Sequence, residues 1–318
     1  MAKPDTLLSV VVPIYNEAPG LGRFNDALVK SVGQTMPNAY EIIYVNDGST
    51  DDTASVITNL ASKNKRVRLL SLSRNFGKEV ATTAGLHAAA GKAIITIDGD
   101  GQHPPELIAD FVKEWRAGNK VVIGLRVANR KEGLVKKLGS RVFYKLANRI
   151  MSLRLEPGAT DFRLIDRAVQ QEFTRMTERN RITRGLIDWL GYKRAYIEFQ
   201  ANPRLAGEAG YSFRKLSKLA VDSVISLSIS PLYISAYVGG IVLPSSTLIG
   251  LSMIIDGIAG DPLGWHVTGS AYLVVVLLFL VGILLVSQGI IGLYLSHIHT
   301  ETQNRPLYVI DDEKTINI

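Results

Sequence analysis

Two long segments without charged residues constrain this chain more than any other sequence feature. No Asp, Glu, Lys or Arg occurs from Ser223 to Ile255 or from Leu263 to Thr300, although such residues make up 20% of the chain. A helix that crosses a bilayer needs about 20 apolar residues. The sequence therefore predicts two membrane spans, at about 231–255 and 271–295.

The alternative for these segments is a helical hairpin buried inside a soluble protein. Such a hairpin needs polar residues on its outer faces, and the apolar run Leu273–Val281 offers none. The flanking charges then give the orientation, because Lys and Arg gather on the cytoplasmic side. Arg214, Lys215 and Lys218 precede the first span, whereas the connector 256–265 holds two aspartates and no Lys or Arg. We expect a multi-pass protein of the inner (plasma) membrane with both termini in the cytoplasm.

The composition of the chain argues against several other kinds of site and partner. The chain has no cysteine, so disulfides, thiolate metal sites and cysteine nucleophiles are absent. Its net charge of +7 is compatible with nucleic acid binding, but beside two predicted spans an anionic membrane surface explains the charge better. The apolar run Leu7–Ile14 is too short for a secretory signal. We therefore expect a membrane partner and no nucleic acid partner.

The N-terminal half alternates short apolar runs with helical stretches. Strands are predicted at Leu8–Ile14, Glu41–Val45, Val67–Ser73, Ala93–Ile97 and Val121–Gly124, and helices at 21–33, 51–63, 78–90 and 105–118. This alternation is typical of an α/β domain with a mostly parallel sheet.

Polar side chains follow four of the predicted strands. They occur at Asn16-Glu17, Asn46–Ser49, Ser73–Asn75 and Asp98–Gln102. Ligands of open parallel sheets bind beyond the carboxyl ends of the strands, so these clusters predict a binding site at one edge of the sheet. The chain lacks the glycine-rich dinucleotide fingerprint and the phosphate-loop motif, which argues against an oxidoreductase or an NTPase.

Asp98 and Asp100, separated by one glycine at a strand end, are candidate ligands for a hard divalent cation that also binds a diphosphate. The alternative for the pair is a solvated turn. Asp47 precedes a segment with the composition of a helix cap, and its carboxylate is a candidate contact for a nucleobase or ribose.

Two basic amphipathic segments lie between the sheet and the predicted spans. One covers 131–155 and the other covers 211–230, directly before the first span. Helices of this kind either lie in a membrane interface or cover a protein core. Beside two predicted spans we favour the interface for both.

Four ordered motifs resemble those of the inverting glycosyltransferases of family two. They are VVPIYNE at 11–17, VNDGSTD at 45–51, RNFGK at 74–78 and DGDGQHPPE at 98–106. The motif TDFRLIDR at 160–167, Arg204–Gly207 and the two C-terminal spans narrow the resemblance to polyprenyl-phosphate glycosyltransferases of the dolichyl-phosphate mannosyltransferase-like branch, and in layout most of all to the bactoprenol glucosyltransferases. The resemblance covers essentially the whole chain.

The resemblance implies a Rossmann-like GT-A catalytic domain at 1–210 and a transmembrane domain with a cytosolic tail at 231–318. By this likeness the nucleotide-sugar contacts are Pro13, Tyr15, Glu17, Asp47, Asp98, Gln102 and Arg204; the metal ligands are Asp98 and Asp100; the catalytic residues are Asp161 and Asp100; and the acceptor phosphate contacts are Arg126 and Arg141. The sequence departs from the family at His103, where Asp is common, and at 208–212, where a usual lysine is missing.

The implied reaction is the metal-dependent, inverting transfer of a hexose to undecaprenyl phosphate, with Mg²⁺ or Mn²⁺ as cofactor. Likeness favours UDP-glucose as the donor, with GDP-mannose as the alternative. Asp161 is either a general base or a positioning group, and we favour positioning. A polysaccharide synthase would carry a Gln-x-x-Arg-Trp motif, which this chain lacks. A non-catalytic membrane scaffold or transport component is the alternative from another class, and a homo-oligomer is among the expected states.

Overall fold

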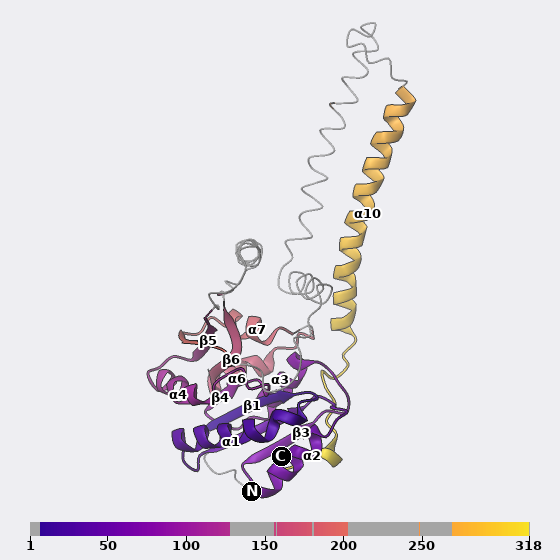
Figure 1. Cartoon of the computed structure of the whole chain (residues 1–318). Helices are drawn as coiled ribbons and strands as arrows, with labels where there is room; N and C mark the ends of the chain where they lie inside the picture. Colours follow the sequence, from indigo (N-terminus) through magenta and orange to yellow (C-terminus); the bar gives the residue numbers. More distant parts are fainter. Residues whose placement is uncertain are drawn as a thin grey trace. The chain divides into compact units, whose positions relative to one another are not determined.

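The computed structural model describes residues 7–127, 156, 158–179, 181–202, 248 and 269–317. The chain divides into two compact units. The first comprises 1–148, 153–212 and 305–318, and the second comprises 149–152 and 213–304. Figure 1 shows the described elements along the chain.

The first unit is built on a sheet of seven strands. The strands are β1 Leu8–Ile14, β2 Tyr40–Asn46, β3 Val67–Ser71, β4 Ala93–Thr96, β5 Val121–Arg126, β6 Ala159–Asp166 and β7 Arg194–Phe199. Their order is β3-β2-β1-β4-β6-β5-β7. Only β6 runs antiparallel to its neighbours, β4 and β5. The prediction of an α/β domain with a mostly parallel, GT-A-like sheet is confirmed.

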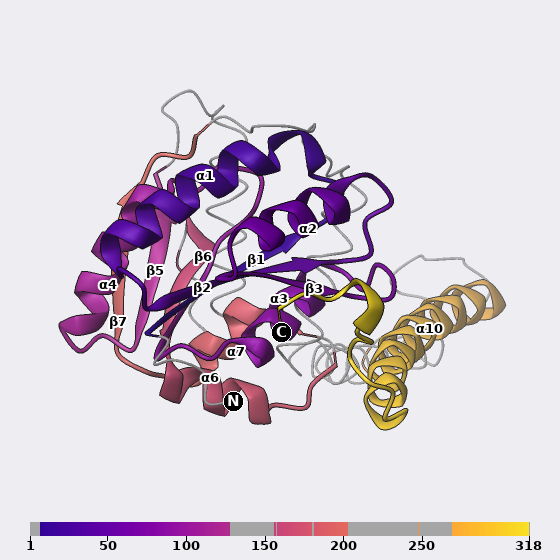
Figure 2. The ribbon, with the colours of Figure 1, turned by 90° about the horizontal axis from the view of Figure 1, so that it is seen from below.

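Helices cover both faces of this sheet (Figure 2). One face carries α1 Ala18–Thr35, α2 Thr53–Lys63 and α4 Ile108–Arg116, and the other carries α3 Lys78–Ala88, α6 Arg167–Arg175 and α7 Thr183–Trp189. A short 3-10 turn, η1 Pro105–Leu107, precedes α4. Successive strand residues point to opposite faces, so Val10 and Val12 of β1 enter one hydrophobic core and Val11 enters the other. Because helices cover both faces of the sheet, every residue of β1 is buried, and all of them except Ser9 and Pro13 are Leu, Val or Ile.

The sequence analysis did not predict β6 and β7. β6 contains Arg163, which is only 2% exposed and whose Nη1 lies 3.0 Å from Asp188 Oδ1. Because this buried charge is neutralised by a residue far along the chain, hydropathy alone does not mark β6 as a strand. β7 lies at the sheet edge with half-exposed residues, which weakens its apolar signal.

The C-terminal segment pairs with the edge strand β3. Isolated bridges join Leu69 to Ile316 and Leu72 to Ile310, and a 3-10 turn, η2 Asp312–Lys314, lies between them. The sequence analysis assigned this segment to the transmembrane domain as a cytosolic tail. The structure instead groups residues 305–318 with the first unit, because backbone hydrogen bonds connect them to β3.

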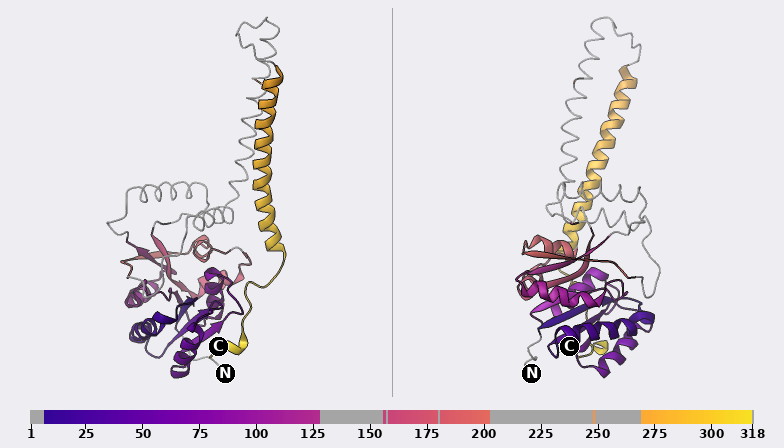
Figure 3. Two further views of the ribbon diagram at one scale, coloured as in Figure 1. Left: turned by 45° about the vertical axis from the view of Figure 1, so that its right-hand side comes forward. Right: turned by 60° about the vertical axis from the view of Figure 1, so that its left-hand side comes forward.

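In the second unit the structure describes the helix α10 Gly269–Thr302, which has 34 residues. Figure 3 shows α10 as one unbroken helix. Across the residues that the structure describes, no helix meets the length and apolarity needed to cross a membrane. The predicted span at 271–295 falls on α10, and the one at 231–255 lies outside the described residues apart from position 248. The predicted helices at 131–155 and 211–230 also lie outside them.

Candidate functional site

The loops that follow β1 and β2 are joined by hydrogen bonds at the carboxyl edge of the sheet. The backbone N–H of Asn16 donates to Ser49 Oγ at 3.1 Å, and Asn16 Oδ1 accepts from the N–H of Thr50 at 2.9 Å. The N–H of Glu17 donates to Thr53 Oγ1 at 2.9 Å. These contacts bring the first two polar clusters of the sequence together.

Asp47 connects this edge to the loop after β3. It is 3% exposed, and its carboxylate accepts from the N–H groups of Phe76 at 2.7 Å and Gly77 at 2.9 Å. Burial raises the pKa of Asp47, and the two backbone donors oppose this effect. Gly48 has φ 66°, and a Cβ there would lie 2.4 Å from the carbonyl carbon of Arg74. Both Asp47 oxygens thus hold this loop, and the predicted nucleotide contact stays a prediction.

The loop ends at Lys78, whose ammonium group lies between two carboxylates. Lys78 Nζ is 2.7 Å from Asp98 Oδ1 and 2.9 Å from Asp161 Oδ2. Three elements meet here, since Lys78 begins α3, Asp98 follows β4 and Asp161 belongs to β6. The sequence analysis named both aspartates but gave Lys78 no role. Its place in the RNFGK motif was the available signal.

The cations around Asp161 keep its carboxyl group ionised. Burial opposes its ionisation, but the positive charges of Lys78 and Arg184 outweigh burial and hold the pKa of Asp161 at about 2. Burial likewise opposes the charge on Lys78, and Asp161 and Asp98 together raise the pKa of Lys78. At neutral pH the site therefore contains a lysine cation and a carboxylate with little affinity for protons.

Asp100 and Gln102 lie in the turn that follows Asp98. Gln102 donates its backbone N–H to Asp100 Oδ1 at 3.0 Å, and Gln102 O accepts from the N–H of Asn202 at 3.0 Å. Gly99 leaves no room for a side chain, because a Cβ there would lie 2.4 Å from Glu17 Oε2. Glu17 is therefore placed directly beside the Asp98–Asp100 turn.

His103, which departs from the family pattern, has a packing role. It is 6% exposed and stacks on Phe162 with ring centroids 5.3 Å apart. The N–H of Asp98 points to His103 Nδ1 at 3.4 Å. Burial lowers the pKa of His103, opposed by the charge of Asp98. The neutral ring supports the turn and adds no third carboxylate.

The donor set suits a divalent cation that binds together with its substrate. Among the described residues, no cluster of three or more His, Asp or Glu side chains is arranged as a metal site. Mg²⁺, however, is commonly held by one or two carboxylates plus substrate phosphates and water. Asp98 and Asp100 fit that pattern, and the Lys78 ammonium beside Asp98 shows that this edge accommodates positive charge.

The remaining predicted contacts are spread along the same edge. Pro13 pairs with Val45 inside the sheet, and Tyr15 is 43% exposed beyond β1. Arg126 ends β5, and its backbone N–H donates to Gly158 O at 2.8 Å. β5 and β4 both run antiparallel to β6, so Arg126 lies at the edge that carries Asp98. Arg141 and Arg204 lie outside the described residues.

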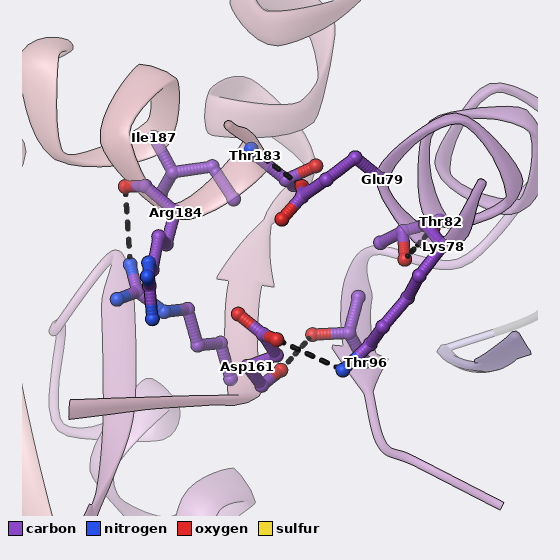
Figure 4. Close-up of a pocket in the computed structure, with 9 residues that line it drawn as sticks. Lys78, Glu79, Thr82, Thr96, Asp161, Thr183, Arg184 and Ile187 are labelled. Carbon is purple, nitrogen blue, oxygen red and sulfur yellow. Dashed lines mark hydrogen bonds and ion pairs between the residues drawn. The ribbon is translucent and has the colours of Figure 1, made fainter. Parts of the chain in front are cut away.

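A pocket adjoins Asp161 on the face covered by α3 and α7 (Figure 4). Its lining residues are Lys78, Glu79, Thr82, Thr96, Asp161, Arg163, Thr183, Arg184 and Ile187. Glu79 Oε2 accepts from the N–H of Thr183 at 2.8 Å, and burial raises the pKa of Glu79. The sequence analysis missed this pocket, because most of its walls come from α7 and from the polar side of α3.

Asp98 and Asp100 can hold an anionic ligand through a divalent cation. A second polar group can bind beside Asp161. Such a pair of adjoining subsites suits a transfer between two bound molecules. The low pKa of Asp161 means that its carboxylate is ionised at neutral pH.

Known proteins resemble this chain over most of its length. Residues 9–174 match the family model Glycosyl transferase family 2. A bactoprenol glucosyl transferase of Shigella phage SfV is 37% identical over 308 residues, which cover 96% of this chain and 99% of that protein. A prophage-derived bactoprenol glucosyl transferase of Shigella flexneri is 38% identical over 304 residues, covering 95% of this chain and 97% of that protein. An uncharacterized glycosyltransferase of Bacillus subtilis, YkcC, is 35% identical over 302 residues, which cover 95% of this chain and 92% of that protein. The chain is therefore a glycosyltransferase and belongs to glycosyl transferase family 2.

Proposed function

We propose that the enzyme transfers glucose from UDP-glucose to polyprenyl phosphate, with undecaprenyl phosphate as the natural acceptor. The convergence of Asp98 and Asp161 on Lys78, at 2.7 and 2.9 Å, carries the proposal. With a diphosphate leaving group at Asp98, the sugar would lie toward Asp161, since both carboxylates contact Lys78. The acceptor class is supported by relatives named as bactoprenol glucosyl transferases that match almost the whole chain.

In the proposed reaction an oxygen of the lipid phosphate attacks the anomeric carbon of glucose. The new carbon–oxygen bond forms as the bond to UDP breaks, so the configuration at that carbon inverts. A phosphate monoester carries about −1.5 to −2 charges at pH 7, so the nucleophile is already deprotonated. Asp161, with its pKa held at about 2, is assigned to positioning rather than to proton removal.

Asp98 and Asp100 would hold Mg²⁺ or Mn²⁺, with the donor diphosphate completing the coordination. When bound, the ion would offset the charge that develops on the departing diphosphate. Gln102 braces Asp100 through its backbone N–H. Arg204 is proposed for the same diphosphate, and Arg126 and Arg141 for the acceptor phosphate.

We place the reaction at the cytoplasmic face of the inner membrane. The support is in the sequence, where the segments 231–255 and 271–295 contain no charged residue. The basic segments 131–155 and 211–230 would hold the first unit at the lipid headgroups. The acceptor phosphate lies at that level, so the enzyme would not need to extract the lipid.

The test is transfer by purified full-length protein from labelled nucleotide-sugars to a short-chain polyprenyl phosphate. UDP-glucose should give a labelled lipid in the presence of Mg²⁺ or Mn²⁺, and EDTA or Asp100→Ala should abolish the product. Transfer from GDP-mannose instead would identify a mannosyltransferase. If no sugar reaches the lipid from any donor in the panel, the proposed transfer to polyprenyl phosphate is wrong.

A further inference from the structure

The side chain of Lys78 has a fixed base and a movable tip. Its residue begins α3, where Lys78 O accepts from Thr82 Oγ1 at 2.9 Å, and the preceding N–H of Gly77 donates to Asp47 Oδ2 at 2.9 Å. The side chain itself is 45% exposed, and its four-carbon stem is flexible. The ammonium group can therefore change partners while α3 stays in place.

Two carboxylates hold the ammonium group at the end of this stem. Nζ lies 2.7 Å from Asp98 Oδ1 and 2.9 Å from Asp161 Oδ2, and Figure 4 shows the stem reaching from α3 toward Asp161. Asp161 is the fixed partner, because it belongs to a central strand and its carbonyl oxygen accepts from Thr96 Oγ1 at 2.6 Å. Asp98 lies in the turn that also contains Asp100. The contact with Asp98 is the one that a competing cation can replace.

A divalent cation and Lys78 compete for Asp98. Mg²⁺ binds carboxylate oxygens at about 2.0 to 2.1 Å, so on Asp98 Oδ1 it would lie within about 5 Å of Nζ. A positive charge at such a distance shifts the proton affinity of a carboxylate by about tenfold to a thousandfold. A doubly charged ion is repelled more strongly than a proton. Lys78 on Asp98 therefore lowers the affinity of the protein alone for the cation.

A diphosphate offers Lys78 a different partner. Held through the cation at Asp98 and Asp100, it would lie beside Nζ, because Nζ is 2.7 Å from Asp98. Hydrogen bonds between an ammonium group and phosphate oxygens are among the stronger ones in proteins. The ammonium group has three N–H donors, so it can keep its contact with Asp161 while it exchanges Asp98 for a phosphate oxygen. Asp98 is then left to the cation.

We propose that Lys78 is a positioning residue that exchanges Asp98 for the donor diphosphate and so makes binding of the cation depend on binding of the nucleotide. When the nucleoside diphosphate leaves after transfer, Lys78 returns to Asp98 and the cation is released with the product. The inference rests on the proposed function and deepens it, because it gives the RNFGK motif a role in loading the donor and releasing the product.

The test measures Mn²⁺ binding to the full-length protein in nanodiscs by electron paramagnetic resonance, with and without saturating UDP. A protein-free sample at the same UDP concentration corrects for Mn²⁺ bound by UDP in solution. Without UDP, Lys78→Met should lower the Kd of Mn²⁺ by about tenfold or more, because the repulsion is gone. With UDP this gain should vanish, so the factor by which UDP tightens Mn²⁺ binding should fall by about tenfold or more.

Binding of UDP gives a second measure of the same coupling. Mn²⁺ must tighten UDP binding by the factor by which UDP tightens Mn²⁺ binding. Calorimetry of UDP with and without Mn²⁺ should therefore show the same smaller factor in Lys78→Met. Lys78→Gln also removes the charge but keeps a hydrogen-bond donor, and it decides the question if Lys78→Met does not fold.

Two further variants separate the proposed exchange from a structural role. Lys78→Arg keeps a positive charge on a long stem and should keep the wild-type dependence of Mn²⁺ binding on UDP. Lys113→Met removes one positive charge from an exposed position of α4 and should leave every Kd unchanged. A lysine that only stabilised the fold would not give tighter Mn²⁺ binding when it is replaced.

Two results would overturn the inference alone. Equal Kd values of Mn²⁺ for wild type and Lys78→Met without UDP would show that Lys78 does not compete for Asp98. An equal gain with and without UDP would show that the ammonium group repels the cation without changing partners. In both cases sugar transfer to the lipid by the wild type would leave the proposed function standing. A wild-type protein that binds neither Mn²⁺ nor UDP would overturn both proposals.

Discussion

Replacing Lys78 with methionine removes the cation between Asp98 and Asp161 while keeping an unbranched side chain. In the native protein the pKa of Asp161 is about 2, against an ordinary value of 3.8. Each pKa unit corresponds to about 1.4 kcal/mol, so the difference corresponds to about 2.5 kcal/mol, of which Lys78 provides the largest stabilising share and Arg184 a smaller one. The Asp161 side chain is 32% exposed, and solvent screening reduces the expected loss of stability to about 1 to 2 kcal/mol.

Thermal unfolding of the full-length protein in nanodiscs measures this loss. For a folded unit of about 150 to 250 residues it should lower Tm at pH 7 by about 2 to 8 °C. The sign of the pH dependence follows from the lowered pKa. The stabilisation is complete above about pH 4 and is lost as the pH falls through about 2. The Tm difference between the two proteins should therefore stay constant from pH 7 to about pH 4 and shrink as the pH falls further toward about 2.

Lys113→Met, at an exposed lysine of α4, controls for the removal of one positive charge and should leave Tm unchanged. Equal Tm values for wild type and Lys78→Met at pH 7 would refute the electrostatic reasoning. A difference that widens toward acid pH would also refute it, because it would mean that the lysine stabilises a protonated carboxyl group.

Three further predictions concern the loops, the cation and the C-terminal segment. Gly48→Ala should lower stability by about 1 to 3 kcal/mol, seen as a lower Tm, because φ is 66° and a Cβ would lie 2.4 Å from Arg74; a native Tm would contradict this. Mn²⁺ should bind more tightly when UDP is present, as measured by electron paramagnetic resonance, because Asp98 and Asp100 provide only two side chains; equal affinities with and without UDP would count against a shared site. Deleting 306–318 should lower Tm, because residues 69–73 lose backbone hydrogen bonds to Val309, Asp311 and Ile316; an unchanged Tm would mean that this pairing adds no stability.

The sequence predicted the parts of the fold that depend on local patterns. Strands β1, β2 and β4 are mostly apolar runs followed by polar clusters, so both the strands and the edge they share follow from hydropathy and chain order. Asp98 and Asp100 were identified in the same way. Asp161 was identified only through a family motif, because its strand contains Arg163, and the compensating Asp188 lies 25 residues away.

Long-range contacts explain what the sequence did not predict. Lys78 is 83 residues from Asp161, and no local pattern indicates that the two meet. Glu79 and Thr183 are 104 residues apart, so their pocket appears only when α3 and α7 pack on the same face. For His103 the sequence showed a departure from the family, but its stacking on Phe162 depends on the placement of β6.

The pairing of residues 309–317 with the region of β3 has a consequence for biosynthesis. Asn317 O accepts from Arg68 Nε, across 249 residues of chain. At about 5 to 20 residues per second, the ribosome needs roughly 12 to 50 s to make the intervening chain. The edge of the sheet thus stays open during translation of both charge-free segments, and it closes only after residues 309–317 have been made. A nascent chain stalled within those segments would carry a nearly finished catalytic unit with one strand edge free to join another polypeptide.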